Sequence, residues 1–339
     1  LADGQVNQIK NLIGNPEVNM EIVQLEKAPK IAVYTPNTSQ PWDDAVTMVM
    51  EYAEIPYEKI YDSAIVMGVL PKFDWLHLHH EDFTGQYGKF YSSASFQPWY
   101  KEQVKVAESN ARMLGFKKVS QLKLAVAQNI KNFVMGGGFL FTMCSGTDSY
   151  DIALSANGVD ICDNIYDGDA ADPNAQNKLE FTKSLAFQNF TLNRDPYFYE
   201  YSNLDASNLR NNATIREQED YFTLFEYSAK WDVVPTMLTQ CHTSTIKGFM
   251  GQSTDFHKEF VKPNVLIMGE TKSIGTARYL HGEYGQGMWT FYGGHDPEDY
   301  QHFVGDPPTD LNLHPNSPGY RLILNNILFP AAKKKKRKT

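Results

Sequence analysis

The sequence predicts a doubly wound α/β fold, in which helices cover both faces of a mostly parallel sheet. Short continuous apolar runs such as KIAVYTP, residues 30–36, are typical of buried parallel strands. Amphipathic helical segments alternate with these runs, as a parallel sheet with crossover helices requires. The chain has 339 residues, 42% of them hydrophobic, which suffices for one large α/β domain or two smaller ones.

The first half of the chain supplies most of the predicted alternation. A short amphipathic helix over residues 5–14 precedes the strand at 30–36. Pro41, with acidic residues beside it, indicates the start of the next helix, because proline and carboxylates favour a first helical turn. The other elements predicted here are strands at 57–61, 73–81 and 138–143 and helices at 97–115, 119–135 and 145–156.

The pattern changes between residues 157 and 231. An acidic, turn-rich stretch leads into aromatic and β-branched alternation without helical periodicity, which we interpret as a partly β insertion. A strand at 264–270, a hairpin around GEYGQG and a helix at 319–329 then follow. The predicted domains are an N-terminal extension (1–29), an α/β domain (30–156 and 232–330), the insertion (157–231) and a basic tail (331–339).

Composition excludes several classes of partner. The net charge is −9 and the pI is near 5.5, so no basic surface is expected that would bind nucleic acid. The exception, KKKKRKT at residues 333–339, is either a solvated terminus or a contact for anionic lipid or nucleic acid. No apolar run approaches the ~20 residues that span a bilayer. We expect a small-molecule, peptide or glycan ligand, and the sequence leaves the oligomeric state open.

Three strands end in reactive residues. The strand at 73–81 ends in His79-His80-Glu81, the next ends at Cys144, and a late strand is followed by His295. Ligands of parallel sheets bind beyond the carboxyl ends of the strands, so we expect these residues to converge at one edge.

Cys144 stands where a nucleophile elbow is expected. Ser145 and Gly146 are small, and the residues around Asp148 can cap the following helix, whose N-terminus would lower the pKa of the thiol. The alternative is a buried cysteine that only fills space. The three cysteines, Cys144, Cys162 and Cys241, form neither a disulfide framework nor a CxxC motif, so they leave the compartment open.

His295 is the natural base for this thiol. Asp296 or Glu298 could orient its second nitrogen, as in a catalytic triad. The alternative is a polar turn whose histidine caps a helix that starts near Pro297.

Metal binding is the only cofactor chemistry that the residues suggest, and no cofactor is predicted outright. On a strand His77 and His79 share one face, and with Glu81 they could bind zinc or a similar ion, although strand histidines also serve as packing residues. An acidic loop lacks the spacing of a calcium loop, so a solvated loop is expected. Its carboxylates are Asp163, Asp167, Asp169 and Asp172.

The elbow cysteine, the late hairpin and the histidine turn together resemble the class I glutamine amidotransferase-like family, which has a flavodoxin-like sheet. This resemblance implies Cys144 as nucleophile, His295 as base and Glu298 or Asp296 as the acid. Thr142 and Asp148 stand where that family has Gly and Gln, so glutamine hydrolysis is not expected. The substrate-binding residues that we expect are His79, His80, Glu81, Ser145, Gly146 and Asp148.

Stretches such as DWLHLHHEDFTGQYGKFY and CSGTDSYDIALSA resemble a Bacteroidetes family labelled asparagine synthetase B. The chain contains neither the N-terminal cysteine nor the SGG-type ATP loop of a true asparagine synthetase. Members of that family carry a signal sequence and an extra upstream portion. With Leu1 in place of Met, this implies a fragment of an extracytoplasmic protein, periplasmic or at the cell envelope, with the cytoplasm as the alternative.

Two functions from different classes follow. One is a Cys–His hydrolase or transferase acting on a small amide, ester or thioester. The other is a non-catalytic binding module of the cell envelope that holds a glycan, a peptide or a metal. A third possibility is a metal-dependent enzyme that uses His77, His79 and Glu81. The aromatic residues expected to line the pocket of a binding module are Trp42, Trp75, Trp99 and Tyr87.

Overall fold

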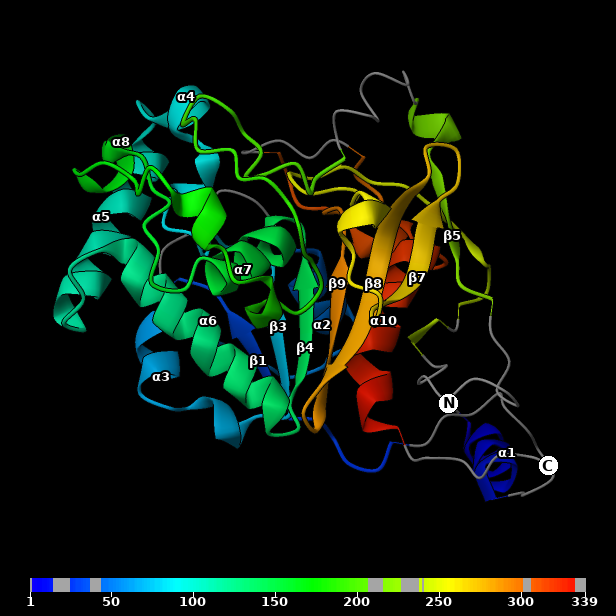
Figure 1. The fold of residues 1–339 in the computed structure, drawn as a ribbon. Coiled ribbons are helices and arrows are strands. Elements are labelled where there is room, and N and C mark those ends of the chain that lie inside the picture. The colour runs from blue at the N-terminus through cyan, green and yellow to red at the C-terminus, as the bar shows by residue number, and fades with distance from the viewer. Residues whose placement is uncertain are drawn as a thin grey trace.

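A computed structural model describes residues 2–14, 25–36, 44–206, 216–226, 238–239, 241–300 and 306–332. In these ranges a single nine-stranded sheet forms the centre of the molecule (Figure 1). In chain order the strands are β1 (Ile31–Tyr34), β2 (Glu58–Ile60), β3 (Trp75–Leu78), β4 (Phe139–Met143), β5 (Tyr221–Leu224), β6 (Thr245–Lys247), β7 (Leu266–Thr271), β8 (Thr276–Tyr284) and β9 (Gly287–Tyr292). Their order across the sheet is β2-β1-β3-β4-β9-β8-β7-β5-β6.

The sheet is mostly parallel, as predicted. The strands β2, β1, β3, β4 and β9 pair in parallel, and the remaining four continue the sheet with antiparallel pairs. Of the nine strands, β8 and β5 therefore run against the other seven. The carboxyl ends of β3, β4 and β9, which are neighbours, meet at one edge of the sheet.

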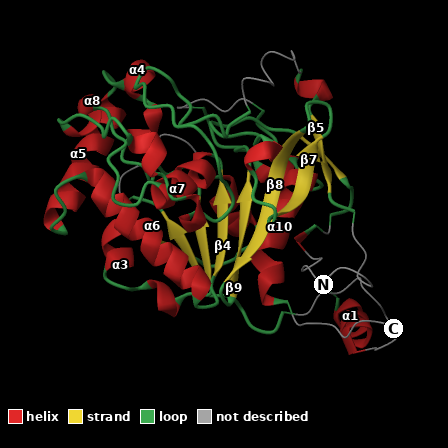
Figure 2. Cartoon of the chain, viewed as in Figure 1, coloured by secondary structure: helices red, strands yellow, loops and turns green. Residues whose placement is uncertain are grey.

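Helices cover both faces of the sheet, as Figures 1 and 2 show. The helices α6 and α7 pack on one face, and α2 packs with α10 on the other. The helices are α1 (Asp3–Gly14), α2 (Ala45–Tyr52), α3 (Asp62–Val66), α4 (Tyr91–Ala94), α5 (Pro98–Met113), α6 (Val119–Met135), α7 (Ser145–Ser155), α8 (Asn164–Asp167) and α10 (Pro318–Leu328).

The alternation of side chains along β3 separates the two cores. Leu76 and Leu78 join the apolar cluster beneath α6 and α7, whereas Trp75 joins the cluster beneath α2 and α10. His77 stacks beside Trp75 on this second face, as a period of two residues predicts. The predicted strands at 57–61, 73–81 and 264–270 and the helices at 97–115, 119–135 and 319–329 are present with slightly shifted ends.

The segment between residues 157 and 206 differs from the predicted alternating β structure. Its only α-helix is α8. Its only β pairing consists of isolated bridges, such as the one between Leu192 and Ser202. Phe187 and Phe190 are fully buried in the core beneath α6 and α7. These two aromatic residues therefore fill the core from irregular backbone, whereas Tyr197, Phe198 and Tyr199 are exposed. The strand β5 belongs to the main sheet.

No helix in the described ranges is long and apolar enough to cross a membrane. Pro41, Trp42 and the basic run 333–339 lie outside the described residues.

Candidate functional site

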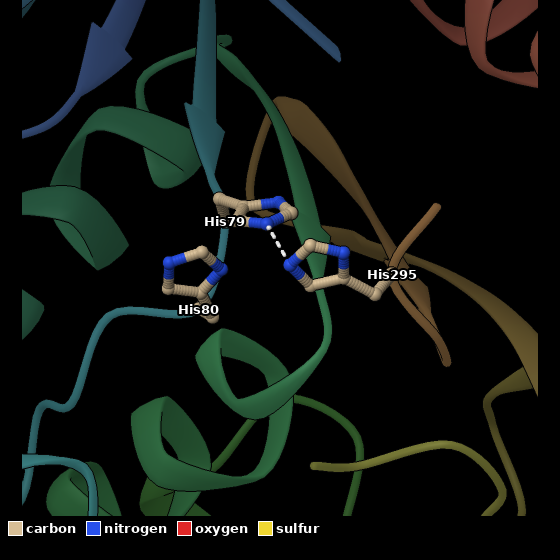
Figure 3. Close-up of side chains that lie close together, drawn as sticks. All are labelled: His79, His80 and His295. Atoms are coloured by element: carbon tan, nitrogen blue, oxygen red, sulfur yellow. Dashed lines mark hydrogen bonds between the residues drawn. The ribbon is translucent and has the colours of Figure 1, made fainter. Parts of the chain in front are cut away.

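Three histidines from two strand ends meet at the carboxyl edge of the sheet (Figure 3). His79 and His80 follow β3, and His295 follows β9. The Nε2 atoms of His79 and His295 lie 3.0 Å apart, and the ring centroids of His79 and His80 are 3.9 Å apart. The nitrogen atoms that the three rings can offer to a ligand all lie within 4.8 Å of one another. This histidine cluster could hold a metal ion.

The elbow at Cys144 lies at the end of β4, between the strands that carry the histidines. Cys144 has φ 49° and ψ −139°, and α7 begins at the next residue. A positive φ is rare for a residue with a side chain and costs of order 1–3 kcal/mol, so surrounding contacts must hold it. Gly146 provides one such contact, because a β-carbon there would lie 2.4 Å from the carbonyl oxygen of His79. The predicted strand-to-helix turn is present.

The thiol of Cys144 is enclosed. Only 2% of the residue is exposed, and the backbone N–H of Gln252 donates a hydrogen bond to Sγ at 3.2 Å. The amides of Ser253 and Ser145 also favour the thiolate, but burial is the stronger effect and raises the pKa of the thiol to about 11. In the described part of the chain no hydrogen bond joins Cys144 to His295. At neutral pH the group is therefore a protonated thiol.

Residues 249–255, which we call the cover segment, lie over this thiol. A β-carbon on Gly251 would lie 3.1 Å from Sγ. The side chain of Gln252 donates hydrogen bonds to the carbonyl oxygens of Gly88 and Tyr199, both at 2.9 Å. Nothing in the sequence marks this segment as part of the site, because it has no regular periodicity and Gln252 lies 108 residues from Cys144 along the chain.

The cover segment is anchored by a buried arginine. Arg278 is fully buried and lies 3.5 Å from Asp220 and 3.8 Å from Asp255. It also donates a hydrogen bond to the carbonyl oxygen of Phe249 and lies over the ring of that residue. These contacts place the guanidinium beside both ends of the segment.

A carboxylate supports the histidine cluster from behind. Both carboxylate oxygens of Asp44, at 3.2 and 3.1 Å, contact Nε2 of His77, and Oδ1 lies 3.6 Å from Nδ1 of His79. Burial would raise the pKa of Asp44, but the charges of His77 and His79 and the hydrogen bond from His77 hold it well below its usual range. Asp44 also caps α2 by accepting from the N–H of Val46. Asp44 was not predicted, although an aspartate just before a helix is a recognisable capping signal.

The predicted metal set of His77, His79 and Glu81 is rearranged in the structure. His77 is fully buried, and its Nδ1 lies 3.2 Å from the carbonyl oxygen of Phe141. Within the described ranges three groups are close enough to share an ion: His79 with His80 and His295, Asp44 with His77 and His79, and Asp160 with Cys162 and Asp167. Glu81 is in none of these groups, and its backbone carbonyl accepts from Ser149.

The two predicted orienting acids have other partners. Asp296 is buried and accepts hydrogen bonds from the hydroxyls of Thr309, at 2.7 Å, and Tyr320. Glu298 lies 3.4 Å from Nδ1 of His314. Asp296 thereby links the turn after β9 to α10, and a role for either acid on His295 stays a prediction.

Asp148 lies in the first turn of α7 and is almost fully buried. Its Oδ1 accepts hydrogen bonds from the hydroxyl of Ser253 at 2.8 Å and from the N–H of Ser149 at 2.9 Å. Burial outweighs these bonds and raises the pKa of Asp148 to about 7. The carboxylate thus links the elbow helix to the cover segment.

The acidic loop is neutralised by lysines. Lys118 pairs with Asp160, Asp167 and Asp169, and Lys178 pairs with Asp172. The carboxylate of Asp163 caps α8. The side chain of Asp167 is only 9% exposed and lies with Asp160 and Cys162 in one of the groups that could hold an ion, so a fully solvated loop is not what the structure shows.

The aromatic residues proposed as a pocket lining mostly fill the core. Trp75 is 1% exposed and donates its indole N–H to the carbonyl oxygen of Asn326 at 3.0 Å. Tyr87 is buried, and Trp99 packs against Phe90. A cavity of about 220 Å³ lies elsewhere, beside the N-terminus of α6, and none of the three histidines lines it.

Comparison with known proteins leaves the family of the chain open. No protein-family model matches the sequence, and no curated protein matches it. Two solved cytoplasmic proteins from Salmonella typhimurium have 10% and 13% identity and TM-scores of 0.43 and 0.44, covering 90% of this chain and 100% of their own. A Thermoplasma acidophilum protein, described as part of a GMP synthase, has 7% identity and a TM-score of 0.40, over 90% of this chain and 96% of its own. At these values the similarity carries no functional argument.

Proposed function

We propose that the chain is an amidotransferase-like hydrolase or acyl transferase in which Cys144 attacks a small amide, ester or thioester. The observation that carries this proposal is the backbone of Cys144, held at positive φ where β4 turns into α7. A nucleophile elbow needs this strained turn, since it presents the side chain at the end of a sheet strand. The parallel strand order β2-β1-β3-β4-β9 also supports the flavodoxin-like sheet that the family resemblance implies.

In the reaction, the sulfur of Cys144 forms a thioester with the acyl carbon, and the amine, alcohol or thiol leaves with a proton. Water, or a second acceptor in a transferase, then takes the acyl group and releases the thiol. Because the pKa of Cys144 is about 11, a base must take the thiol proton during attack. His295 is the proposed base, and access requires displacement of the cover segment from Sγ.

The test is covalent trapping on a panel of activated esters, thioesters and amides. Mass spectrometry of the wild-type chain is expected to find an acyl group on Cys144, with a burst of released product. C144S and C144A should abolish both signals, whereas C241S should leave them intact. Turnover that survives in C144A would overturn the proposal.

A non-catalytic binding module is the second candidate, because the thiol is enclosed rather than presented to solvent. The cover segment then has a structural role, and the ligand, a glycan, a peptide or a metal, binds beyond the strand ends. This candidate expects no acyl adduct on any cysteine, and ligand binding that is equal in the wild-type chain and in C144A.

A further inference from the structure

We infer that His79, His80 and His295 bind one divalent transition-metal ion of the zinc class, with a fourth position open to water or a substrate oxygen. The inference goes beyond the proposed thiol chemistry and does not require it. Three imidazoles from two strands bring their nitrogen atoms within 4.8 Å of one another (Figure 3). Such convergence of nitrogen ligands is the first requirement of a metal site.

The separation of the rings suits a small ion. Zinc binds histidine nitrogen at about 2.0–2.1 Å, so two ligands of a tetrahedral site lie about 3.3 Å apart. The Nε2 atoms of His79 and His295 are 3.0 Å apart, which is within a few tenths of an ångström of that value. His80 stacks nearly parallel to His295, with an interplanar angle of 12° and ring centroids 5.3 Å apart, and completes the group.

The outer contacts of His79 have the arrangement that metal ligands need. A ligating histidine turns one nitrogen to the ion and its other nitrogen to a carboxylate, which fixes the ring and raises its basicity. His79 directs Nε2 to His295, and its Nδ1 faces Asp44 at 3.6 Å, an ion-pair distance rather than a hydrogen bond. The position of Asp44 is in turn fixed by His77 and by the cap of α2. This places His77 behind the site rather than in it.

The ligand set also selects the kind of ion. Imidazole nitrogen suits zinc, copper, nickel and iron, whereas calcium and magnesium prefer oxygen ligands. In the part of the chain that the structure describes, this group has three protein ligands, and a tetrahedral site with three protein ligands keeps one position open, which is typical of catalytic rather than structural zinc sites. His80 as a residue is half-buried, but both of its ring nitrogens are shielded from solvent, so the ion would lie inside the cluster.

Nε2 of His295 cannot both bind the ion and act as the base for Cys144. An Nε2 atom that binds the ion has no lone pair left to accept the proton of Cys144. The metal-bound form would therefore require another base for the proposed acyl transfer, and the two hypotheses can fail separately.

The test is metal stoichiometry and affinity on the full chain. The protein is stripped with a chelator, titrated with zinc and analysed by elemental analysis, and cobalt(II) provides the visible spectrum of a four-coordinate site. We expect one zinc per wild-type chain. In H80A and H295A the affinity should fall by more than about a hundredfold, beyond what loss of an outer-shell partner costs.

Two controls separate the metal site from folding and from the thiol. H257A removes a histidine outside the cluster and should bind zinc like the wild type, and C144S should do the same. Thermal unfolding of each variant without metal shows whether it folds. No stoichiometric zinc in the wild type, or unchanged affinity in a folded H80A or H295A, would overturn the inference.

Discussion

The elbow at Cys144 and the histidine cluster lie at the same edge of the sheet, but they are built in opposite ways. The elbow is defined by backbone: a positive φ, a glycine that touches β3 and amides that surround the sulfur. The histidine cluster is defined by side chains, with a carboxylate behind them and one half-buried residue, His80. Burial suppresses ionisation of the thiol, whereas the cluster brings together the imidazole nitrogens that a transition-metal cation needs.

This difference shows that the backbone geometry of an elbow and the reactivity of its thiol are separate properties. A strand-to-helix corner follows from the α/β fold itself, so it can persist whether or not its thiol reacts. Converging histidines have no such general structural cause, because imidazoles rarely need one another to be buried. The cluster is therefore the stronger indication of a ligand, and the elbow by itself indicates only the fold.

The largest expected effect tests the charge at the elbow. Because Asp148 has a pKa raised to about 7, the native state binds a proton between about pH 4 and 7 that the unfolded state has lost. Stability should therefore fall as pH rises through this window, by about 4 kcal/mol in total. D148N, which stays neutral, should remove most of this slope. Urea unfolding at several pH values across the window measures it.

The D148N variant also distinguishes the elbow from the histidine cluster, because the charge of Asp148 raises the pKa of Cys144. Alkylation of Cys144 at fixed pH should be faster in D148N, while zinc binding by the histidines should not change. An unaltered pH slope in D148N would show that Asp148 ionises normally in the native state.

The second largest expected effect comes from a substitution that disturbs both the elbow and the histidine cluster. In G146A the new methyl group would lie 2.4 Å from the carbonyl oxygen of His79, so the end of β3 and the start of α7 must separate. We expect a loss of about 3 kcal/mol, as for overpacking in a rigid core, together with weaker zinc binding. G136A is the matched control, since its methyl group would meet only carbonyl oxygens at 3.5 Å or more. Equal unfolding curves for the two variants would contradict the close contact.

A smaller effect concerns the histidine cluster alone. D44N keeps a side-chain oxygen that can cap α2 but removes the charge beside His77 and His79. Zinc affinity should fall by about 10- to 100-fold, as expected for an outer-shell carboxylate. Competition with a chromophoric chelator measures the affinity. If D44N binds zinc as tightly as the wild type, the carboxylate does not orient His79.

The sequence was sufficient to predict the elements that depend on local pattern. Apolar runs and helical periodicity placed β3, β4 and α6, and the rule for parallel strands placed Cys144, His79 and His295 at one edge. Small residues after Cys144 predicted the turn. These are consequences of backbone geometry, which a local stretch of sequence specifies.

The contacts within that edge could not be predicted, because they join residues distant in the chain. His79 and His295 are 216 positions apart, and Gln252 and Cys144 are 108 apart. Periodicity indicated which face of β3 His77 would occupy, but nothing local revealed that Asp44 would stand there. The irregular aromatic segment up to residue 206 has a sequence typical of β alternation, but its buried residues occur in consecutive runs such as 184–187 and its backbone forms no strand.

The smallest effect decides whether the elbow can become accessible. Gln252 holds the cover segment through two hydrogen bonds to the carbonyl oxygens of Gly88 and Tyr199. In Q252A these bonds are lost at a cost of about 1–2 kcal/mol, which favours opening of the segment by about 5- to 30-fold. The rate at which iodoacetamide labels Cys144, followed by peptide mass spectrometry, should rise accordingly. Labelling of Cys241, which is already partly exposed, should stay constant.

Q128A is the matched control, because that glutamine bonds to Asn157, away from the elbow, through an exposed contact. If Q252A leaves the labelling of Cys144 unchanged, opening of the cover segment does not limit access to the thiol. The binding module would then be favoured over the hydrolase. If labelling and acyl transfer both rise, the cover segment is what restricts the access of substrates to Cys144.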